Sequence, residues 1–496
     1  MNEDIFIGID LGTGSVKAVA LDSKGRCIAN SKRILNTHYA PGGKAEQSPV
    51  AWLDRSGECL RELADRIQAI GYRPAGVGVT GQMNAPVLLN SAGCAPRSVQ
   101  IWCDSRCAPQ CERINQDIPL ANLIEITGHT AVAGYTAPKL LWIEENARDV
   151  LDGASDLIFP KDLINYALTG IIATDYSDAS NSLLLDIRQA DWSQSIVDAL
   201  GIPSRILPSL VCSTDRLGVI SSEGEQWSGL PRETPVAGGA GDSIASAFGA
   251  GLADSTTSQI VIGTAGNVNC VSDRICVDPL GRVHTGYFVD RSHWICSCVQ
   301  QTAGASLQWW SEITSLSAND LLGEIDDAPV SESLRFAPYL SGERTPHLDP
   351  HVRGAFLGLE RSTTRKDLTL AILEGVAFSF RDAFEVLENL GNCARNVLLC
   401  GGGAESLLWS RIVQAVIDKP MQRLTCETTA RGAAALAACA AGHFSDWRES
   451  IESWPVAGET VLTNDEWRRH YRKVYPVHRS VYPMLKDFGK FSYRKE

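Results

Sequence analysis

The chain has 496 residues, of which 44% are apolar and 21% charged, and its formal net charge is −13. A length well beyond about 250 to 300 residues exceeds what one hydrophobic core supports, so we expect a globular protein of two domains. The negative charge argues against a general nucleic-acid or anionic membrane surface, which clustered Lys and Arg would favour. An acidic protein can still bind a phosphorylated ligand through backbone N–H groups or a metal ion.

We expect a cytoplasmic location. The first ten residues, MNEDIFIGID, place acids where a signal peptide has basic residues. No segment approaches the roughly 18 consecutive apolar residues of a transmembrane helix. The fifteen cysteines are interpreted as reduced, buried small hydrophobes. Cys103, Cys107 and Cys111 would line one face of a helix, but no close Cys pair or His accompanies them, so a metal role is the weaker interpretation.

The first half of the chain alternates strand and helix patterns. IFIGID and VKAVALD flank the turn LGTGS, and this pattern predicts a β-hairpin within the first 25 residues. A helix is predicted over residues 50–70, followed by a strand in AGVGVTGQM that ends in a Gly-rich turn. The alternation continues to about residue 245 and predicts an α/β domain.

The second half repeats this organisation. Residues 258–271, SQIVIGTAGNVNCV, again read strand, turn, strand, and HWICSCVQQ predicts a neighbouring strand. Residues 396–417, NVLLCGGGAESLLWSRIVQAVI, predict a buried strand, a glycine turn and a helix. The likeness of IDLGTGSVKAV to VIGTAGNVNCV indicates a duplicated domain. We predict domains over residues 1–248 and 249–496 that pack around a cleft, with a closing helix from about Trp467.

Three glycine-rich turns each follow a β-rich run, at residues 12–15, 263–266 and 401–403. Glycines there let backbone N–H groups approach an anion, and neighbouring hydroxyls add donors. A single turn of this kind is more often plain hairpin chemistry. The first two occupy equivalent places in a duplicated domain, so together they predict two hairpins that grip one polyphosphate. Asp10 precedes the first turn, where a metal ion bridging the carboxylate to phosphate best explains it.

Asp242 carries the only charge in VAGGAGDSIASAFGAG, residues 236–251. Its position before a predicted helix permits an N-cap role. A carboxylate among small residues also permits close approach of a sugar hydroxyl and a phosphate, and Asp can accept the hydroxyl proton during attack. The residues alone support these two interpretations about equally.

Several motifs resemble those of the FGGY carbohydrate kinases. IGIDLGTGSVKAVALD and the GTAGNV turn are similar to the family's two phosphate motifs, and LLCGGGAESLLW is similar to its adenosine motif. GYTAPKLLWIEE and GAFLGLERSTTRKDLTLAILE resemble two longer family signatures, so the resemblance covers nearly the whole chain. It implies two ribonuclease-H-like α/β domains of the actin/hexokinase type with a cleft between them, and an ATP- and Mg²⁺-dependent sugar kinase.

The resemblance also implies roles for individual residues. Asp242 matches the family's catalytic base, and Asp10 together with Asp242 matches the metal site. The implied nucleotide contacts are Gly12, Thr13, Gly14, Ser15, Lys17, Gly263, Thr264, Gly304, Gln308, Gly402 and Gly403. The implied sugar contacts are Gln82, Met83, Asn84, Trp102, Asp104, Asp242 and Ser243.

Within the family the chain is most similar to xylulokinases, which implies conversion of D-xylulose to D-xylulose 5-phosphate. Asn84 stands where these kinases have His, and Ser243 where they have Asn. Such changes in a sugar pocket can re-order substrate preference, so D-ribulose, L-xylulose and an erythritol-type polyol are alternatives. A nucleotide-binding switch without sugar chemistry is a more distant alternative. The expected partners are a sugar and ATP, without nucleic acid or membrane, and a homodimer is left open.

Three further features receive structural interpretations. Glu427 is interpreted as a helix cap. His347 and His351 lie between prolines and are expected in a loop instead of a helical metal pair. The SGERTP stretch, residues 341–346, is a candidate to reach the cleft.

Overall fold

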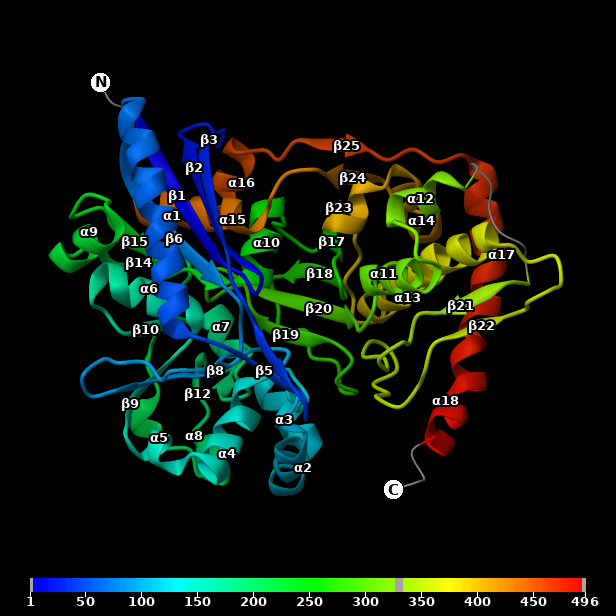
Figure 1. Cartoon of the computed structure of the whole chain (residues 1–496), viewed down its shortest axis with the longest axis horizontal. Coiled ribbons are helices and arrows are strands. Elements are labelled where there is room, and N and C mark those ends of the chain that lie inside the picture. The colour runs from blue at the N-terminus through cyan, green and yellow to red at the C-terminus, as the bar shows by residue number, and fades with distance from the viewer. Residues whose placement is uncertain (1–2, 326–332, 493–496) are drawn as a thin grey trace.

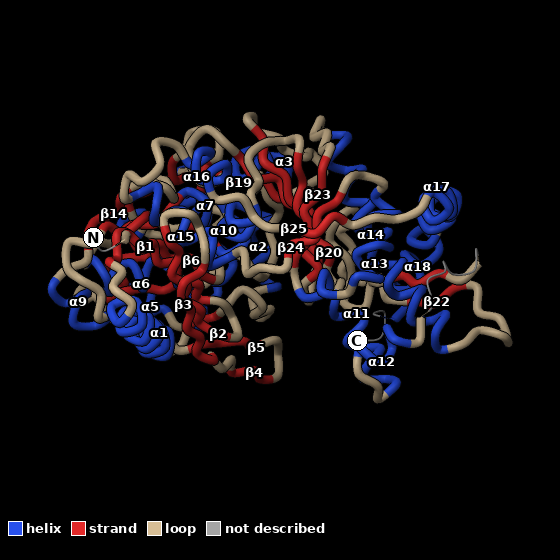
Figure 2. Tube along the Cα trace, turned by 90° about the horizontal axis from the view of Figure 1, so that it is seen from above, coloured by secondary structure: helices blue, strands red, loops and turns tan. Residues whose placement is uncertain are grey.

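The computed structural model describes residues 3–325 and 333–492, which form two α/β domains, each built on a central sheet (Figure 1). Seen from above, strands β1, β3 and β6 lie together at the left and β20, β23 and β24 lie together near the middle of the molecule (Figure 2). Among the described residues no helix combines the length and the apolar character needed to cross a membrane.

The first sheet has the strand order β14-β15-β6-β1-β2-β3, and β16 also pairs with β6. The bounds are β1 (Asp4–Leu11), β2 (Ser15–Asp22), β3 (Cys27–Ile34), β6 (Arg73–Gly81), β14 (Arg216–Val219), β15 (Pro235–Ala237) and β16 (Ala240–Gly241). β1 runs antiparallel to β2, with Asp10 opposite Lys17, and parallel to β6. The predicted hairpin is therefore confirmed.

The second sheet has the order β19-β20-β18-β17-β23-β24-β25. The bounds are β17 (Thr257–Ile262), β18 (Gly266–Ser272), β19 (His284–Tyr287), β20 (Trp294–Gln300), β23 (Asn396–Cys400), β24 (Met421–Leu424) and β25 (Gly458–Thr460). β17 is antiparallel to β18 and parallel to β23, and β18 is antiparallel to β20. In the first sheet β1 is likewise antiparallel to β2 and parallel to β6, and β2 is antiparallel to β3. The two sheets share this pairing, so the predicted duplication is confirmed.

Smaller sheets complete both domains. In the first domain they are β4 (His38–Ala40), β5 (Lys44–Gln47) and β8 (Val99–Gln100); β7 (Val87–Asn90) with β9 (Ala154–Ile158); β10 (Ala173–Asp175) with β13 (Ser209–Val211); and β11 (Leu185–Asp186) with β12 (Asp191–Trp192). In the second domain β21 (Arg335–Ala337) pairs with β22 (Ala355–Leu357).

The helices of the first half are α1 (Pro49–Ala69), α2 (Ala108–Asp117), α3 (Leu120–Thr127), α4 (Thr136–Asn146), α5 (Arg148–Asp152), α6 (Pro160–Thr169), α7 (Tyr176–Ser180), α8 (Gln194–Leu200), α9 (Ser222–Ser228) and α10 (Asp242–Ala250). Those of the second half are α11 (Gly304–Thr314), α12 (Ala318–Gly323), α13 (Arg365–Asn389), α14 (Leu407–Ile417), α15 (Thr429–Ala440), α16 (Trp447–Ser453), α17 (Asp465–Arg479) and α18 (Val481–Ser492). α17 and α18 agree with the predicted C-terminal helix.

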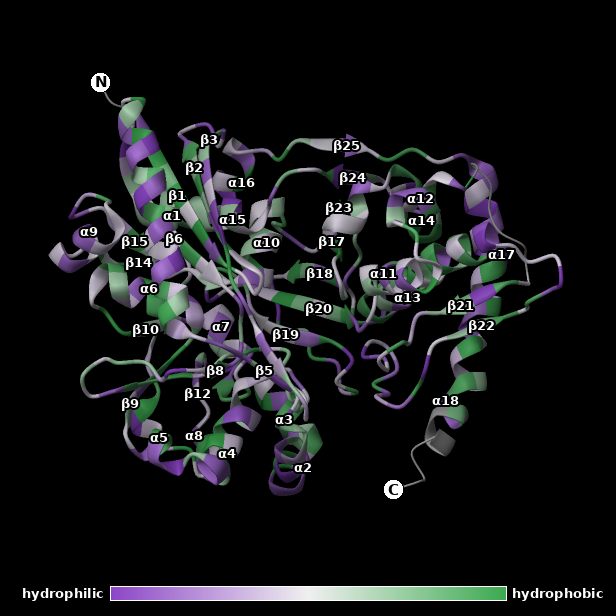
Figure 3. Ribbon diagram, viewed as in Figure 1, coloured by the Kyte–Doolittle hydropathy of each residue, from purple (hydrophilic) through white to green (hydrophobic). Residues whose placement is uncertain are grey.

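Local sequence explains where α1 begins and which face it buries. Ser48 is its N-cap and accepts the N–H of Ala51, and Pro49 takes the first helical position, where its missing N–H costs nothing. Trp52, Cys59 and Leu63 are among its buried residues, so one apolar stripe faces the first sheet. Figure 3 shows the same contrast elsewhere, with hydrophobic colour along β20 and hydrophilic colour on the outer helix α17.

Helices α10 and α15 lie between the two sheets. α15 comes from the C-terminal part of the chain, yet it packs on β1 and β6 of the first sheet and on α10. Gly8 and Gly78 make this possible, because a Cβ at either position would overlap the α15 backbone. A hydrophobic core that includes Phe248 and Leu436 joins the domains here. Where the domain boundary falls along the chain remains a prediction.

The expectation for the cysteines is wrong in two respects. All fifteen are free thiols, but Cys27, Cys94, Cys393 and Cys426 are exposed. Cys103, Cys107 and Cys111 also do not form one helical face, because α2 begins only at Ala108. The carboxylate of Asp104 accepts the N–H of Arg106 at 3.1 Å. This Asx-type turn competes with a helix and delays its start.

Candidate active site

The second and third glycine turns meet at one edge of the second sheet. Gly263 follows β17 and Gly401 follows β23, and these neighbouring strands end together, with Val261 opposite Cys400. The N–H of Gly304, at the start of α11, donates to the carbonyl of Gly263 at 2.8 Å. A Cβ at Gly304 would lie 2.6 Å from that oxygen, so only glycine fits there. Thr264 accepts the N–H of Ala303 at 3.0 Å. The sheet edge thus brings three predicted nucleotide segments together.

The remaining predicted nucleotide residues differ in their surroundings. No heavy atom lies within 4 Å of a Cβ built on Gly402 or on Gly14, so the backbone at both positions is open to a ligand. Gly403 instead packs against Ile262 and Trp409. The amide of Gln308 donates to Glu312 at 3.2 Å on the exposed side of α11.

The first hairpin turn is anchored by a chain of side-chain hydrogen bonds. The indole N–H of Trp102 donates to Thr13 Oγ1 at 2.8 Å, and the amide of Gln47 donates to the Thr13 carbonyl at 2.7 Å. Gln82 is fully buried and donates to Gln47 Oε1 at 2.7 Å. Gly12 donates its N–H to the carbonyl of Ser15 at 3.1 Å, which closes the turn.

Two carboxylates that repel each other lie beside this hairpin: Asp10, which is buried, and Asp242, which is half-buried. Asp10 is 4% exposed, and its Oδ1 has no hydrogen-bond partner. Lys17 Nζ lies 3.6 Å from Asp10 and 3.5 Å from Glu427, whose carboxylate also accepts the N–H of Ala430 at 2.8 Å. Glu427 therefore binds the first N–H groups of α15, as a cap does, although the N-cap position itself is Thr428. Burial raises the pKa of Asp10 to about 8, and the negative charge of Asp242 adds to the effect.

Asp242 is the first residue of α10, and Gly241 is the N-cap. The N-cap interpretation of Asp242 is therefore off by one residue, because Gly239 and Gly241 place the turn before it. Its carboxylate accepts the N–H of Ser243 at 2.7 Å. Burial raises the pKa of Asp242 to about 6.

The glycine stretch before Asp242 is fixed by hydrogen bonds to buried side chains. Ser177 Oγ accepts the N–H of Gly241 at 3.1 Å, and the amide of Asn165 donates to the carbonyl of Gly238 at 2.9 Å. Ser177 is itself positioned by Asp175, which caps α7 and accepts the Ser177 N–H at 2.9 Å. The backbone in front of Asp242 is thus fixed by fully buried polar groups.

Asp175 belongs to a fully buried ion cluster that the sequence analysis did not identify. Lys161 Nζ lies 3.0 Å from Asp175, 3.7 Å from Asp178, and in direct contact with Asp162. All four side chains are no more than 1% exposed. Burial raises the pKa of Asp178, and the nearby Asp242 charge raises it further. The acids in TDYSD, residues 174–178, between apolar and hydroxylated neighbours, were the available sequence signal.

A cavity of about 220 Å³ lies between the domains and contains Asp242. Of the residues predicted on the sugar side, Met83, Asn84, Trp102 and Ser243 also line it. Gln82 and Asp104 are not among its lining residues. Asp104 instead accepts the N–H of Ala45 at 2.8 Å and pairs with Arg106 at 2.6 Å.

The cavity also holds polar residues that the sequence analysis missed. They are His129, Tyr135 and Asn181 from the first domain, and Asn267, Asn269, His284 and Arg344 from the second. Arg344 belongs to SGERTP, so this stretch does reach the cleft. His347 and His351 lie in a loop, as expected.

Asn84 is held in an unusual backbone conformation at the cavity. Its φ is 67°, in the left-handed region. The buried Lys139 donates from Nζ to the Asn84 carbonyl at 2.8 Å and also to the carbonyl of Gly134. Burial lowers the pKa of Lys139 to about 7. Lys139 lies in the GYTAPKLLWIEE signature but received no role from the sequence.

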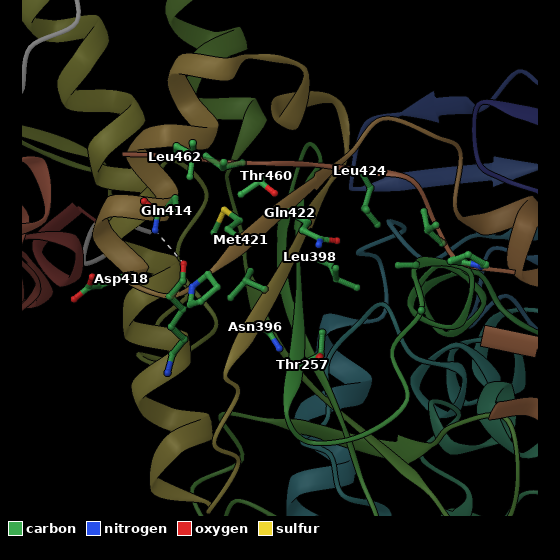
Figure 4. A pocket seen from close by; sticks show the side chains of 18 of the residues that line it. Thr257, Asn396, Leu398, Gln414, Asp418, Met421, Gln422, Leu424, Thr460 and Leu462 are labelled. Atoms are coloured by element: carbon green, nitrogen blue, oxygen red, sulfur yellow. Dashed lines mark hydrogen bonds between the residues drawn. The ribbon is translucent and has the colours of Figure 1, made fainter. Parts of the chain in front are cut away.

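A larger cavity, of about 750 Å³, lies where the chain crosses between the domains. The residues that line it include Gly251 after α10, Thr257 at the start of β17, Leu424 at the end of β24, and Pro455 and Val456 between α16 and β25. Figure 4 shows its walls on β23 and β24. None of the predicted site residues lines it. The chemistry is therefore assigned to the smaller cavity, which contains Asp242.

Comparison with known proteins identifies the family. The N-terminal domain of the FGGY family of carbohydrate kinases matches residues 5–249, and its C-terminal domain matches residues 259–441. The chain belongs to the FGGY family of carbohydrate kinases. The actin-like fold of two α/β domains and the kinase activity implied by the sequence motifs are confirmed, and FGGY kinases use ATP as the phosphoryl donor.

Relatives and structures agree on the fold but differ in substrate. A xylulose kinase from Lactococcus lactis is 34% identical over 484 residues, which is 96% of each chain. The structure of a xylulose kinase from Rhodospirillum rubrum is 27% identical, covers 98% of this chain and 100% of its own, and gives a TM-score of 0.89. A gluconate kinase from Lactobacillus acidophilus, 24% identical and with coverage of 99% and 100%, gives 0.92. The fold alone therefore does not identify the sugar.

Proposed function

We propose that this FGGY kinase transfers the γ-phosphoryl group of ATP to the terminal hydroxyl of a ketopentose. D-xylulose is our first choice, with D-xylulose 5-phosphate as product. The observation that carries the proposal is the position of Asp242, whose half-buried carboxylate lines a cavity rich in polar residues and also interacts with Asp10 beside the first glycine hairpin. The similarity to xylulose kinases over nearly the whole chain supports the choice of sugar.

In the proposed reaction Asp242 is the general base. The substrate oxygen forms a bond to the γ-phosphorus as the bond from that phosphorus to the bridging oxygen of ADP breaks, and the hydroxyl proton moves to the Asp242 carboxylate. A pKa of about 6 leaves the carboxylate mostly ionised at neutral pH while making it a better proton acceptor than an ordinary Asp. Domain closure around both substrates would exclude water and limit ATP hydrolysis.

The glycine turns are proposed to hold the nucleotide. Backbone N–H groups of residues 12–15 and 263–264 would bind the phosphates from two sides, with Lys17 as a neutralising charge. Gly304, Gln308, Gly402 and Gly403 would bind the nucleoside on the edge of the second sheet. The open backbone at Gly14 and Gly402 supports this arrangement.

A magnesium ion fits the carboxylate pair. Asp10 offers a buried oxygen without a partner, and Asp242 repels it, so a cation at this place would relieve both penalties. Mg²⁺ prefers oxygen ligands and is commonly held by one or two carboxylates together with phosphates and water. We propose Asp10 and Asp242 as its protein ligands. When bound, the ion would neutralise charge on the phosphates.

The choice of sugar depends on two residues of the cavity. Ser243 Oγ lies 3.3 Å from the sulfur of Met83, and Asn84 Oδ1 is buried without a partner. Both residues line the cavity and differ from the xylulokinase pattern. D-ribulose, L-xylulose or an erythritol-type polyol on the same kinase is therefore the second candidate. A nucleotide-dependent switch without sugar chemistry would leave the polar cavity around Asp242 unexplained.

A panel of sugars tests the proposal. ADP release is measured with ATP, Mg²⁺ and each of D-xylulose, D-ribulose, L-xylulose, erythritol and gluconate. We expect the highest kcat/KM for D-xylulose and little ATP turnover without sugar. A strong preference for another sugar would replace the substrate but keep the kinase. Absence of sugar-stimulated turnover, together with nucleotide-dependent assembly, would favour the switch.

The cytoplasmic location stays part of the proposal, since fifteen free thiols fit a reducing compartment.

A further inference from the structure

Three polar side chains form a hydrogen-bonded cluster in the wall of the sugar cavity. Tyr135 Oη lies 2.6 Å from His284 Nδ1 and 3.0 Å from His129 Nδ1, and the two Nδ1 atoms are 3.2 Å apart. His129 and Tyr135 come from the first domain, and His284 comes from β19 of the second. The N–H of Thr285 donates to the carbonyl of Gly128 at 3.2 Å and joins the same two segments.

The three short contacts decide where the protons lie. Burial lowers the pKa of both histidines, to about 3 for His129, and the nearby Arg344 lowers that of His284 further. Both rings are therefore neutral, and each carries one N–H. The 2.6 Å contact fits the O–H of Tyr135 donating to His284 Nδ1. We assign the second proton to His129 Nδ1, which then donates to Tyr135, because a bare His129 Nδ1 would face lone pairs on both Tyr135 Oη and His284 Nδ1.

This assignment fixes the outer nitrogen of each ring. With its proton on Nδ1, His129 presents Nε2 as a bare acceptor, and with Nδ1 accepting, His284 carries its proton on Nε2. His129 is 1% exposed, and its Nε2 has no hydrogen-bond partner among the described residues. A buried acceptor without a partner costs free energy, so the site is built for a donor that the protein does not supply.

We propose that His129 and His284 bind the terminal hydroxyl at the end of the sugar remote from the one that Asp242 deprotonates. This inference rests on the proposed function, because it takes the 220 Å³ cavity as the sugar site. The hydroxyl donates to His129 Nε2 and accepts from His284 Nε2. Tyr135 is a positioning residue that holds both tautomers.

The pair selects a chemical class of substrate. A hydroxyl can donate and accept at once, whereas a carboxylate can only accept. A carboxylate at this end of the sugar would leave His129 Nε2 without a hydrogen-bond donor. The carboxylate oxygen would also be repelled by the lone pair of this nitrogen. The cluster therefore favours neutral ketoses and polyols over sugar acids such as gluconate, and it requires a hydroxyl on the remote terminal carbon.

The test pairs a deoxy substrate with a variant. The preferred sugar of the panel is compared with its analogue that lacks the remote terminal hydroxyl, which for D-xylulose is 1-deoxy-D-xylulose. We expect kcat/KM of the unaltered enzyme to fall by at least about tenfold on removal of this hydroxyl. In His129→Leu the same removal should cost less than about threefold, because the acceptor is gone. The KM for ATP should be unchanged.

Two further variants complete the experiment. Tyr135→Phe keeps the aromatic ring but removes the hydroxyl that fixes the tautomers of His129 and His284, so it should reduce the penalty for the missing substrate hydroxyl. It also provides a second test of the cluster if His129→Leu does not fold. His347→Leu, at another partly buried histidine outside this cavity, should keep the full penalty. A penalty below twofold in the unaltered enzyme, or one that persists in both cluster variants, would overturn the inference while leaving the kinase intact. Inactivity of the unaltered enzyme on every sugar would overturn the proposed function and this inference together.

Discussion

Lys139 Nζ donates a hydrogen bond of 2.8 Å to the main-chain carbonyl of Asn84. The bond holds Asn84 at a φ of 67°, and it places the side chain of Asn84 at the cavity that contains Asp242. A left-handed backbone at a non-glycine residue is uncommon, and it persists where the surroundings enforce it. A lysine buried in one signature therefore shapes the cavity that we propose as the sugar site, which is built from another segment.

Replacing this lysine should affect the sugar more than the nucleotide. In Lys139→Met the carbonyls of Asn84 and Gly134 lose their donor, so we expect a loss of about 1 to 3 kcal/mol of stability and a rise of about tenfold or more in sugar KM. The KM for ATP should stay within about twofold. Steady-state kinetics with each substrate varied separately measures both values. An unchanged sugar KM in a folded variant would contradict the positioning role.

The ion cluster below Asp242 should be far more sensitive than an exposed pair. Lys161→Met leaves Asp162, Asp175 and Asp178 buried without their cation. We expect it to lower the free energy of unfolding by about 3 to 5 kcal/mol. The matched control is Arg55→Met, which breaks the exposed pair with Glu58 and should cost less than about 1 kcal/mol. Urea unfolding of both variants checks the contrast, and similar losses in the two would refute it.

Close contact between α10 and α15 depends on glycine. A Cβ at Gly432 would overlap the carbonyl oxygen of Ala245, so Gly432→Ala forces the two helices apart. We expect a loss of about 1 to 3 kcal/mol, as for other overpacked sites. At Gly323 no heavy atom lies within 4 Å of a built Cβ, and Gly323→Ala should be neutral or slightly stabilising. Thermal unfolding distinguishes them, and equal melting temperatures for the two variants would count against this packing.

Acid should destabilise the protein partly through His478. This residue is fully buried against Phe378, and neither ring nitrogen has a hydrogen-bond partner among the described residues. Burial lowers its pKa from 6.5 to about 3. Below pH 6.5 the unfolded chain binds a proton at this site that the folded protein does not, so stability falls as pH falls towards 3. The loss by pH 5 is about 2 kcal/mol for this group.

His478→Phe removes the group at which the unfolded chain binds the extra proton. Its free energy of unfolding should therefore depend less steeply on pH between 6.5 and 5 than that of the unaltered protein. Above about pH 7.5, where the histidine is neutral in the unfolded chain too, the two curves should run parallel, whatever their offset. Denaturant unfolding at several pH values measures the slopes. Identical slopes below pH 6.5 would show that His478 is not neutral in the folded state.

Much of the fold could be predicted because its strands and turns are local patterns. The two hairpins, α1, β6 and the β23 turn all follow from short apolar runs punctuated by glycines. The glycine turns proposed to bind phosphate could be recognised in the same way. The start of α2 could not, because one Asp side chain, that of Asp104, competes for the backbone N–H groups.

The polar cavity was harder to predict, because its residues come from distant segments. His129 and His284 are 155 positions apart and meet only when the domains pack. Lys139 and Lys161 look like ordinary surface residues in their local sequence, and only tertiary burial reveals them. Asp242 was found because it is a lone charge in a small-residue stretch, which is a local feature.

The central claim is that Asp242 accepts the proton of the sugar hydroxyl, and Asp242→Asn tests it most directly. Sugar-dependent ADP release and ATP binding are measured on the same preparation of the folded variant. We predict that kcat falls by about 10² to 10⁴-fold while the Kd for ATP stays within about threefold. Sugar phosphorylation within about tenfold of the unaltered enzyme would contradict the claim.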